Sequence, residues 1–274
     1  MPTLTVERKH RVLHVTLNRP EKRNALTSEM CAGIVHAIRS ADDDIHVGSI
    51  LLGAAGPVFC SGMDVDEALA MTHAQLADLH DDLFSIGFNS KKPIIVCVNG
   101  AAFGGGVGLV AQGHIVLASE NSVFGLTEIR IGLWPFMVYR SVEAAIGPRR
   151  TLELSLTGRT FNSHDALDWA MVHQVCPPAE TYDRAKGVAR EIAKASPAAI
   201  DAGLDYYHRS RGKSWEDAGD LAAELRVKVM DSEDLKEGFD AFKHRREPRW
   251  PSMPPEFYQK HPVGTIKTNN GSDR

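Results

Sequence analysis

The sequence lacks the residue clusters by which disulfide-rich and metal-binding proteins are recognised. Its 274 residues include four cysteines, at Cys31, Cys60, Cys97 and Cys176, which lie far apart and form no Cys-x-x-Cys pair. This spacing excludes a disulfide framework, and no His-Glu-x-x-His or comparable ligand spacing occurs, so we expect no metal site. The first ten residues contain no apolar stretch typical of a signal peptide. We therefore expect a cytoplasmic protein.

An excess of charge of either sign is also lacking. Lys and Arg number 31 against 35 Asp and Glu, which gives a net charge of −4. This balance excludes a nucleic-acid footprint over the whole surface, so we expect no nucleic-acid partner. Residues 93–119 carry no charge, but glycines interrupt them repeatedly. A buried strand, a glycine loop and a buried helix fit this stretch better than a membrane span, and no membrane partner is expected.

The composition that remains is that of a soluble globular protein, with 43% hydrophobic and 24% charged residues. A chain of this length buries about three quarters of the surface that it exposes when unfolded. One large domain, or one domain with a helical appendage, is therefore feasible without disulfides or metals.

Strand patterns dominate the first part of the chain. Apolar and polar residues alternate over residues 3–8 and 12–17, which predicts a β-hairpin. A helix follows, with Ser28 as its expected N-cap. Residues 49–53 and 93–98 are apolar on both faces, which is typical of strands covered by helices on both sides.

Helical patterns dominate the remainder. Residues 64–88 are helical in pattern, and β signals nearly vanish after about residue 148. The helices expected there cover residues 150–155, 163–171, 181–194, 198–208, 215–230 and 232–243. The sequence thus predicts an α/β core followed by a helical C-terminal part. The proline-rich end after Pro248 is expected to be loose or docked on a neighbour.

Two glycine-containing turns can supply backbone donors for an oxyanion. Residues 99–108 form a glycine-rich loop between a buried strand and an apolar helix that begins near Gly105. Residues 56–64 form a second turn, with free N–H groups expected near Met63. Two such donors aimed at one carbonyl oxygen make an oxyanion hole. Two tight turns without a chemical role are the alternative.

Glu128 is the candidate acid/base residue. It lies in a largely apolar segment, residues 122–130, and burial raises the pKa of a carboxyl group toward the range useful for proton transfer. The pattern is about equally compatible with a purely structural role, in which Glu128 forms an ion pair with Arg130 or Arg140.

Two short segments weakly resemble motifs of other enzyme classes, a dinucleotide-binding motif and a nucleophile on a turn. Residues 106–111 match the dinucleotide fingerprint G-x-G-x-x-A, with Glu128 where a ribose-binding acid is sought, but the fingerprint does not follow its strand directly. Cys60 and Ser61 lie on a turn before a helix, as a nucleophile can, but no G-x-S-x-G motif is present.

Five segments together resemble the crotonase superfamily, also called the enoyl-CoA hydratase/isomerase family, over almost the whole chain. They are Leu-Asn-Arg-Pro-Glu-Lys-Arg-Asn-Ala-Leu (17–26), Phe-Cys-Ser-Gly-Met-Asp (59–64), Val-Asn-Gly-Ala-Ala-Phe-Gly-Gly-Gly (98–106), Leu-Thr-Gly-Arg (156–159) and Glu-Asp-Leu-Lys-Glu-Gly-Phe-Asp-Ala-Phe-Lys (233–243). The segments occur in the family's order and spacing, and jointly they are highly specific.

The resemblance implies a crotonase-like α/β fold: a ββα spiral core over residues 1–195 and a helical trimerisation region over residues 196–274. It implies an acyl-CoA substrate, no cofactor beyond the coenzyme A of that substrate, and a homotrimer or hexamer.

The resemblance also implies roles for individual residues. The N–H groups of Met63 and Gly105 would hold the thioester oxygen, and the carbonyls of Ser61 and Met63 would contact adenine. Phe242 and Lys243 match the stretch that approaches the nucleotide, often from a neighbouring subunit.

The sequence departs from the hydratase pattern at one of two glutamates. Gly108 stands at the first position, and only the second, Glu128, is kept. Bulky residues follow it, and Trp134 and Phe136, with Tyr139, are expected to shape the acyl pocket.

One carboxylate suffices to move a proton between two carbons, so the resemblance favours an enoyl-CoA isomerase. An enoyl-CoA hydratase and a catalytically impaired acyl-CoA-binding protein remain alternatives. The sequence leaves open whether Asp64, Asp66 or Glu67 joins the site.

Overall fold

The fold is given by a computed structural model that describes residues 2–260. The chain divides into two compact units, Met1–Ala193 and Lys194–Arg274. The sequence predicts this division between residues 195 and 196. The catalytic and oligomerisation roles assigned to the two parts stay predictions.

Two sheets form the first unit. The larger has the strand order β1-β2-β3-β5-β7-β10 and the smaller the order β4-β6-β8-β9. Only the pairs β1/β2 and β8/β9 are antiparallel within these sheets. The strands are β1 (Leu4–Lys9), β2 (Val12–Leu17), β3 (Ser49–Ala54), β4 (Val58–Cys60), β5 (Ile94–Val98), β6 (Ala101–Phe103), β7 (Ile115–Ser119), β8 (Val123–Gly125), β9 (Thr160–Asn162) and β10 (Gln174–Cys176). The predicted hairpin and both predicted buried strands are confirmed.

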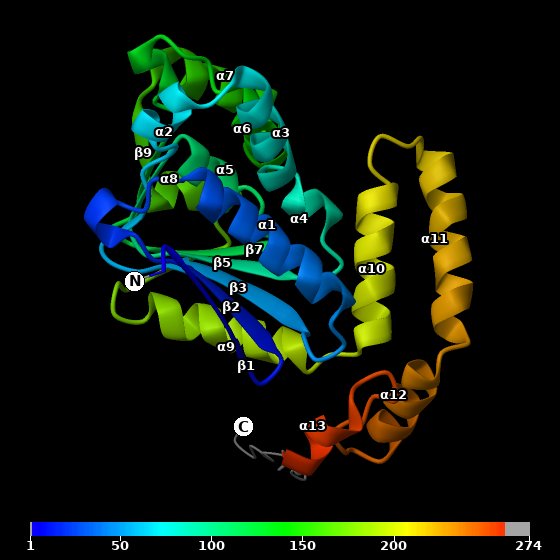
Figure 1. Cartoon of the computed structure of the whole chain (residues 1–274). Helices are drawn as coiled ribbons and strands as arrows, with labels where there is room; N and C mark the ends of the chain where they lie inside the picture. Colours follow the sequence, from blue (N-terminus) through cyan, green and yellow to red (C-terminus); the bar gives the residue numbers. More distant parts are fainter. Residues whose placement is uncertain (1, 261–274) are drawn as a thin grey trace, which may run out of the picture. The chain divides into compact units, whose positions relative to one another are not determined.

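Helices cover both faces of the larger sheet. Because successive side chains of a strand point to opposite faces, Ile50 and Leu52 pack in the core cluster that contains α1 (Ser28–Asp43). Leu51 packs in the other cluster, which contains α9 (Thr181–Ala193). Figure 1 shows α1 and α9 on opposite sides of this sheet. Burial on both sides explains why the parallel strands are apolar throughout.

The four cysteines lie inside these cores and are free thiols. Burial raises the pKa of the Cys31, Cys60 and Cys97 thiols to about 12. These cysteines therefore pack as small apolar residues.

The N-cap of α1 differs from the prediction by one residue. The side chain of Thr27 accepts a hydrogen bond from the Met30 N–H at 3.2 Å. Ser28 instead donates its backbone N–H and its hydroxyl to Glu67. Thr27 and Ser28 are equally good N-cap residues in the sequence. Glu67, which is distant in the chain, binds Ser28 and leaves Thr27 as the cap.

The segment 64–88 is three helices and not one, which corrects the prediction. They are α2 (Val65–Ala70), α3 (His73–Leu83) and α4 (Ile86–Asn89). Thr72 accepts a hydrogen bond from the Gln75 N–H, and the Gln75 side chain accepts from the Thr72 N–H. This capping box starts a new helix inside a periodic stretch.

The next part of the chain also departs from the prediction. The helix predicted near Gly105 is α5 (Gly105–Val110), which is short, and α6 (Phe136–Ile146) was not foreseen. Aromatic and β-branched residues at the start of α6 favour helices weakly, so packing of its Val138 and Val142 stabilises it. The helices predicted over 150–155 and 163–171 are confirmed as α7 (Pro148–Thr157) and α8 (Ser163–Asp168), whereas the short strands β9 and β10 occur where β signals nearly vanish.

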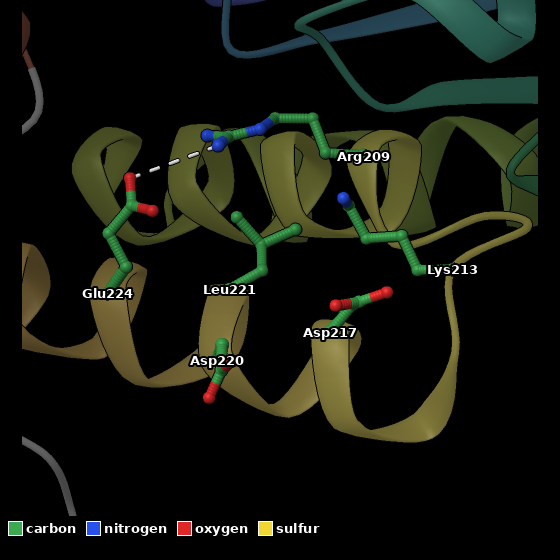
Figure 2. A pocket seen from close by; sticks show the side chains of 6 residues that line it. All are labelled: Arg209, Lys213, Asp217, Asp220, Leu221 and Glu224. Carbon is green, nitrogen blue, oxygen red and sulfur yellow. Dashed lines mark ion pairs between the residues drawn. The ribbon is translucent and has the colours of Figure 1, made fainter.

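The second unit is helical, as predicted. Its helices are α10 (Pro197–Arg209), α11 (Trp215–Met230), α12 (Glu233–Lys243) and α13 (Pro255–Lys260). Figure 2 shows a pocket lined by residues of α10, of α11 and of the segment between them, in which Arg209 forms an ion pair with Glu224 at 3.9 Å. Arg209 also pairs with Asp205, one turn earlier on α10, at 2.9 Å. Within residues 2–260, no helix is both long enough and apolar enough to span a membrane.

Hydrogen bonds attach the segment that directly follows Pro248 to its own unit, where the sequence predicts a tail that is loose or docked on a neighbour. Ser252 donates its N–H and its hydroxyl to the buried Asp234, which also accepts from the Ser196 hydroxyl. Trp250 donates its indole N–H to the Lys194 carbonyl at 2.7 Å. The remainder of the predicted tail, from residue 261, lies outside the described residues.

Candidate active site

One cavity brings together six of the residues singled out in the sequence. It has a volume of about 510 Å³ and lies in the first unit. The six are Ser61, Met63, Gly105, Glu128, Trp134 and Phe136. Phe242 and Lys243 belong to the second unit, where both are exposed on α12. The structure therefore assembles the predicted acyl and proton-transfer residues, while the roles assigned to them stay predictions.

Two backbone N–H groups in this cavity have no protein acceptor. Leu26 bridges the turn at Met63, donating its N–H to the Gly62 carbonyl at 2.8 Å and accepting from the Asp64 N–H at 2.9 Å. This pairing leaves the Met63 N–H unused. Gly105 opens α5, so its N–H has no intrahelical acceptor. Neither N–H donates to any acceptor in the described part of the chain.

The turns that carry these donors depend on left-handed glycines. Gly62 has φ +102° and Gly104 has φ +51°, a conformation that other residues rarely adopt. The turns are in contact, because a Cβ atom on Gly62 would lie 3.7 Å from the Gly105 nitrogen. Two unpaired donors at neighbouring turns can stabilise negative charge on one oxygen atom.

Glu128 lies beside these turns, at the start of the 3₁₀ turn Glu128–Ile131. A Cβ atom on Gly104 would lie 3.0 Å from its Oε1 atom, and its Oε2 atom is buried without a hydrogen-bond partner. Burial raises the pKa of this carboxyl group above its usual value. Glu128 forms no ion pair with any described residue, and Arg140 pairs with Asp81 instead. An unpaired, desolvated carboxylate is suited to proton transfer.

Gly108 faces a wall of apolar side chains. A Cβ atom there would lie 2.5 Å from Cγ1 of Val138 and 2.7 Å from Cε1 of Phe84. Both residues line the cavity. The space that a second glutamate would need at this position is therefore filled, and Glu128 is the only carboxylate among the described lining residues.

The three other acidic candidates do not line this cavity. Asp64 forms an ion pair with Arg19 at 2.6 Å, which lowers the pKa of the Asp64 carboxyl group. Glu67 accepts from Ser28, as described above. Asp66, with Asp64, lines a neighbouring cavity. Asp64 and Glu67 thus hold α2 in place.

The neighbouring cavity has a volume of about 560 Å³ and more polar walls. The two cavities adjoin along shared lining residues: Ser61, Met63, Val65, Thr127 and Ile131. Lys22, Arg23 and Arg130 contribute three cationic side chains to the second cavity. An elongated molecule with an apolar end and an anionic end could occupy both.

The structure explains the dinucleotide fingerprint and the nucleophile candidate as features of the packing. A Cβ atom on Gly106 would lie 2.4 Å from the Cys60 carbonyl oxygen, so this fingerprint glycine packs against protein. Cys60 is fully buried and its pKa is raised to about 12, which is unsuited to a nucleophile. Among residues 2–260 no cluster of three or more His, Cys, Asp or Glu side chains could hold a metal ion.

One polar residue of the cavity was missed at the sequence level. His80 lies on α3 and shares a cavity-lining face with Ala77 and Phe84. The spacing of three and four residues places these side chains on one side of a helix. The sequence does not reveal this cavity-lining face, because residues 64–88 are predicted as one helix and not as three.

The basic residues at and after the end of α12 are partly neutralised by acidic neighbours; they are Lys243, Arg245, Arg246 and Arg249. Arg246 forms ion pairs with Glu237 and Asp240, each at 2.5 Å, and this lowers the pKa of Glu237 to about 2. Lys243 and Arg245 are exposed.

Comparisons with known proteins agree on one family. The sequence model of a family described as enoyl-CoA hydratase/isomerase matches residues 7–253. The (E)-benzylidenesuccinyl-CoA hydratase of Thauera aromatica is 34% identical over 251 residues, covering 89% of this chain and 97% of the relative. A crystal structure of an enoyl-CoA hydratase of Mycobacterium smegmatis superposes with a TM-score of 0.86 at 27% identity, covering 91% of this chain and 99% of the other.

A third relative bears on location. The enoyl-CoA hydratase domain-containing protein 3 of Xenopus laevis, which is named as mitochondrial, is 28% identical over 253 residues, covering 91% of this chain and 86% of the relative. The cytoplasmic location of this chain stays a prediction.

Proposed function

This chain belongs to the enoyl-CoA hydratase/isomerase family, and on that premise we propose that it moves a double bond along the acyl group of an enoyl-CoA thioester. The fold, an α/β crotonase fold, is shared with the family. Two observations carry the proposal: Glu128 is the single carboxylate among the described lining residues, and apolar side chains fill the space at Gly108.

The thioester oxygen would accept hydrogen bonds from the unpaired N–H groups of Met63 and Gly105. Removal of a proton next to the thioester carbonyl moves negative charge onto this oxygen. Donors that are already in place stabilise that charge without reorganisation, and each such donor contributes on the order of 3 kcal/mol where it has been removed by mutation.

Glu128 would carry the proton. Its carboxylate takes a proton from C2 of a 3-enoyl thioester, which gives a dienolate, and returns the proton to C4 as the double bond moves to C2–C3. The product is an isomer of the substrate, so no other reactant and no cofactor is required. The raised pKa of Glu128 makes its carboxylate a stronger base, which favours removal of the proton from C2.

Hydration would need a water molecule held against the double bond by a second polar group. Phe84 and Val138 occupy the space at Gly108 where a hydratase of this family has its first glutamate. This is why we favour isomerisation, although relatives of this chain carry the name hydratase.

Coenzyme A would extend from the shared lining residues into the second cavity, whose walls carry three basic and three acidic side chains. Ser61 and Met63 line both cavities, which suits contacts from their carbonyls to the adenine end. Lys22, Arg23 and Arg130 are placed for attraction of phosphates. Phe242 and Lys243 would complete this site from a neighbouring subunit of a homotrimer or hexamer.

The oligomeric state can be measured directly. The side chains of Trp215 and Phe242 are 90% and 86% exposed in the single chain, and large apolar residues of this kind are typical of interfaces. Light scattering should give a mass of three or six chains. A monomer at catalytic concentration would remove Phe242 and Lys243 from the proposed site.

The function is tested by assaying 3-enoyl-CoA and 2-enoyl-CoA thioesters side by side. We expect isomerisation to exceed hydration, and Glu128→Gln to lower kcat by a factor of roughly 10² or more. Glu120→Gln, which changes an exposed glutamate, is the matched control. Hydration that dominates in the wild type would favour the hydratase alternative, and tight acyl-CoA binding without turnover would favour the binding-protein alternative.

A further inference from the structure

His80 is a polar residue in an otherwise apolar part of the cavity. Of the described residues that line the cavity, Glu128 and His80 are the ones with an acidic or a basic side chain. The wall around the remainder of the cavity is made largely of apolar groups: Leu133, Trp134, Pro135, Phe136, Met137 and Val138. A polar group in such a wall usually fixes the orientation of a ligand.

The ring nitrogens of His80 have no partner in the described chain. No hydrogen bond or ion pair joins either of them to a residue between positions 2 and 260. Burial lowers the pKa of His80, so the ring is neutral at pH 7 and presents one N–H donor and one acceptor nitrogen. Neither nitrogen is enclosed without a partner, so water can reach the ring, and a ligand that displaces this water must supply a hydrogen bond in its place.

The backbone of α3 is anchored on both sides of the cavity face. Asp81 pairs with Arg140 of α6 at 2.5 Å, and Asp82 pairs with Arg39 of α1 at 2.7 Å. These residues directly follow His80 in the helix. The segment next to His80 is therefore joined to two neighbouring helices by ion pairs on the protein surface.

The Phe84 ring lies next to both His80 and the turn that carries the Gly105 donor. A Cβ atom on Gly105 would lie 3.4 Å from Cζ of Phe84, so the Phe84 ring adjoins the proposed oxygen-binding donor. The His80 ring packs against Phe84 with 5.9 Å between ring centroids and an angle of 50°. His80 is thus about one aromatic ring further from the donor, where it would meet a more distant part of the acyl group.

We propose that His80 determines specificity by hydrogen bonding to a carbonyl or hydroxyl oxygen that the acyl group carries beyond its reacting carbons. The preferred substrates are therefore oxygen-substituted enoyl-CoA thioesters. This inference rests on the proposed function for its reacting carbons. A site built around a hydrogen bond discriminates strongly against an analogue that lacks the bonding group.

The test uses matched pairs of saturated acyl-CoA thioesters that differ only by a hydroxyl or keto group, over a series of chain lengths. Calorimetry measures their affinities, so the result does not depend on turnover. At one chain length the wild type should bind the oxygenated member at least about tenfold more tightly, the effect expected of one well-made buried hydrogen bond.

His80→Phe keeps a ring and removes both nitrogen functions, and it should abolish this preference while the affinity for the plain member changes little. His80→Gln, which can still donate, should restore part of the preference. His36→Phe removes an exposed histidine from α1 and should leave both affinities unchanged.

Equal affinity of the wild type for both members at every chain length would overturn the proposal. So would an equal loss of affinity for both members in His80→Phe, which would indicate a packing role. Failure of the proposed function has a different signature: the binding preference persists while 3-enoyl-CoA is not isomerised, or while Glu128→Gln isomerises it at the wild-type rate.

Discussion

The ring of Phe84 lies 2.7 Å from the point where a Cβ atom of residue 108 would stand. This contact affects both the packing around residue 108 and the polarity of the cavity. A glycine is required at position 108 because Phe84 and Val138 fill the adjoining space, and the same two side chains make that side of the cavity apolar.

Gly108→Ala should destabilise the fold by about 1–3 kcal/mol, the usual effect of an added methyl group in a filled core. Urea unfolding measures the difference. Gly187→Ala on α9 is the control, because a Cβ atom there meets nothing within 4 Å, and it should stabilise the protein by about 0.5–1 kcal/mol. A harmless Gly108→Ala would mean that Phe84 moves freely, and a second glutamate could then be accommodated.

Glu128→Gln should make the protein more stable at pH 8. Burial raises the pKa of Glu128, so the folded state binds its proton more tightly than the unfolded state. The stabilising contribution of this group is present below the unfolded pKa and is lost as the pH rises through the folded pKa. Removing the buried, unpaired charge should therefore increase the free energy of unfolding by on the order of 1–3 kcal/mol.

Thermal melts of the wild type and Glu128→Gln from pH 8 to about pH 4 check this expectation. The difference in Tm should shrink as the pH falls. A constant difference, or a less stable variant at pH 8, would show that the carboxylate has a stabilising partner when charged.

The rate of isomerisation should fall on the acid side at a higher pH than an ordinary glutamate would give. Proton removal from carbon needs the ionised form of Glu128, and burial raises the pH at which that form is reached. The profile of kcat/KM against pH measures the acid limb of the free enzyme. An acid limb at the usual pKa of glutamate would argue that Glu128 is solvated or is not the base.

Asp64 has two separable roles. Its carboxylate caps α2 by accepting from the Glu67 N–H and pairs with Arg19 at 2.6 Å. Asp64→Asn keeps the cap and loses the charge, whereas Asp64→Ala loses both. Chemical denaturation should therefore show a larger loss for Asp64→Ala, by about 1 kcal/mol.

The effect of Asp64→Asn should depend on pH. Arg19 lowers the pKa of Asp64, so the ion pair contributes stability above the unfolded pKa of aspartate and loses it as the pH falls through the folded pKa. The gap between the wild type and Asp64→Asn should accordingly close in acid. Equal stability of both at neutral pH would mean that the ion pair has no net effect.

The sequence predicted the elements whose signal is local. The hairpin and the strands at Ile50–Leu52 and Ile95 follow from patterns that are complete within a few residues. The break between α2 and α3 depends on the Thr72 capping box, a short polar signal that the periodicity of its surroundings concealed. The order of strands in the two sheets is set by contacts between distant segments and cannot be derived from any one of them.

In the candidate site, too, the sequence predicts the residues with a local signal and misses those whose role depends on distant segments. Glu128, Met63 and Gly105 were found because each lies in a distinctive short segment. The residues that contact Gly108 could not be found this way, because Phe84, which follows α3, and Val138, on α6, lie far from Gly108 in the chain and on either side of it. His80 was missed for a similar reason, since only the position of its helix shows that it faces the cavity.

The burial of all four cysteines has a practical consequence for spectroscopy. A maleimide reagent attacks thiolates that solvent can reach, and the cysteine thiols here are enclosed, three of them with a pKa of about 12. A single cysteine introduced at Leu69 on α2, which is 83% exposed, would therefore react alone in the folded wild-type background. A fluorophore at that position would follow α2 during acyl-CoA binding without removal of any native thiol.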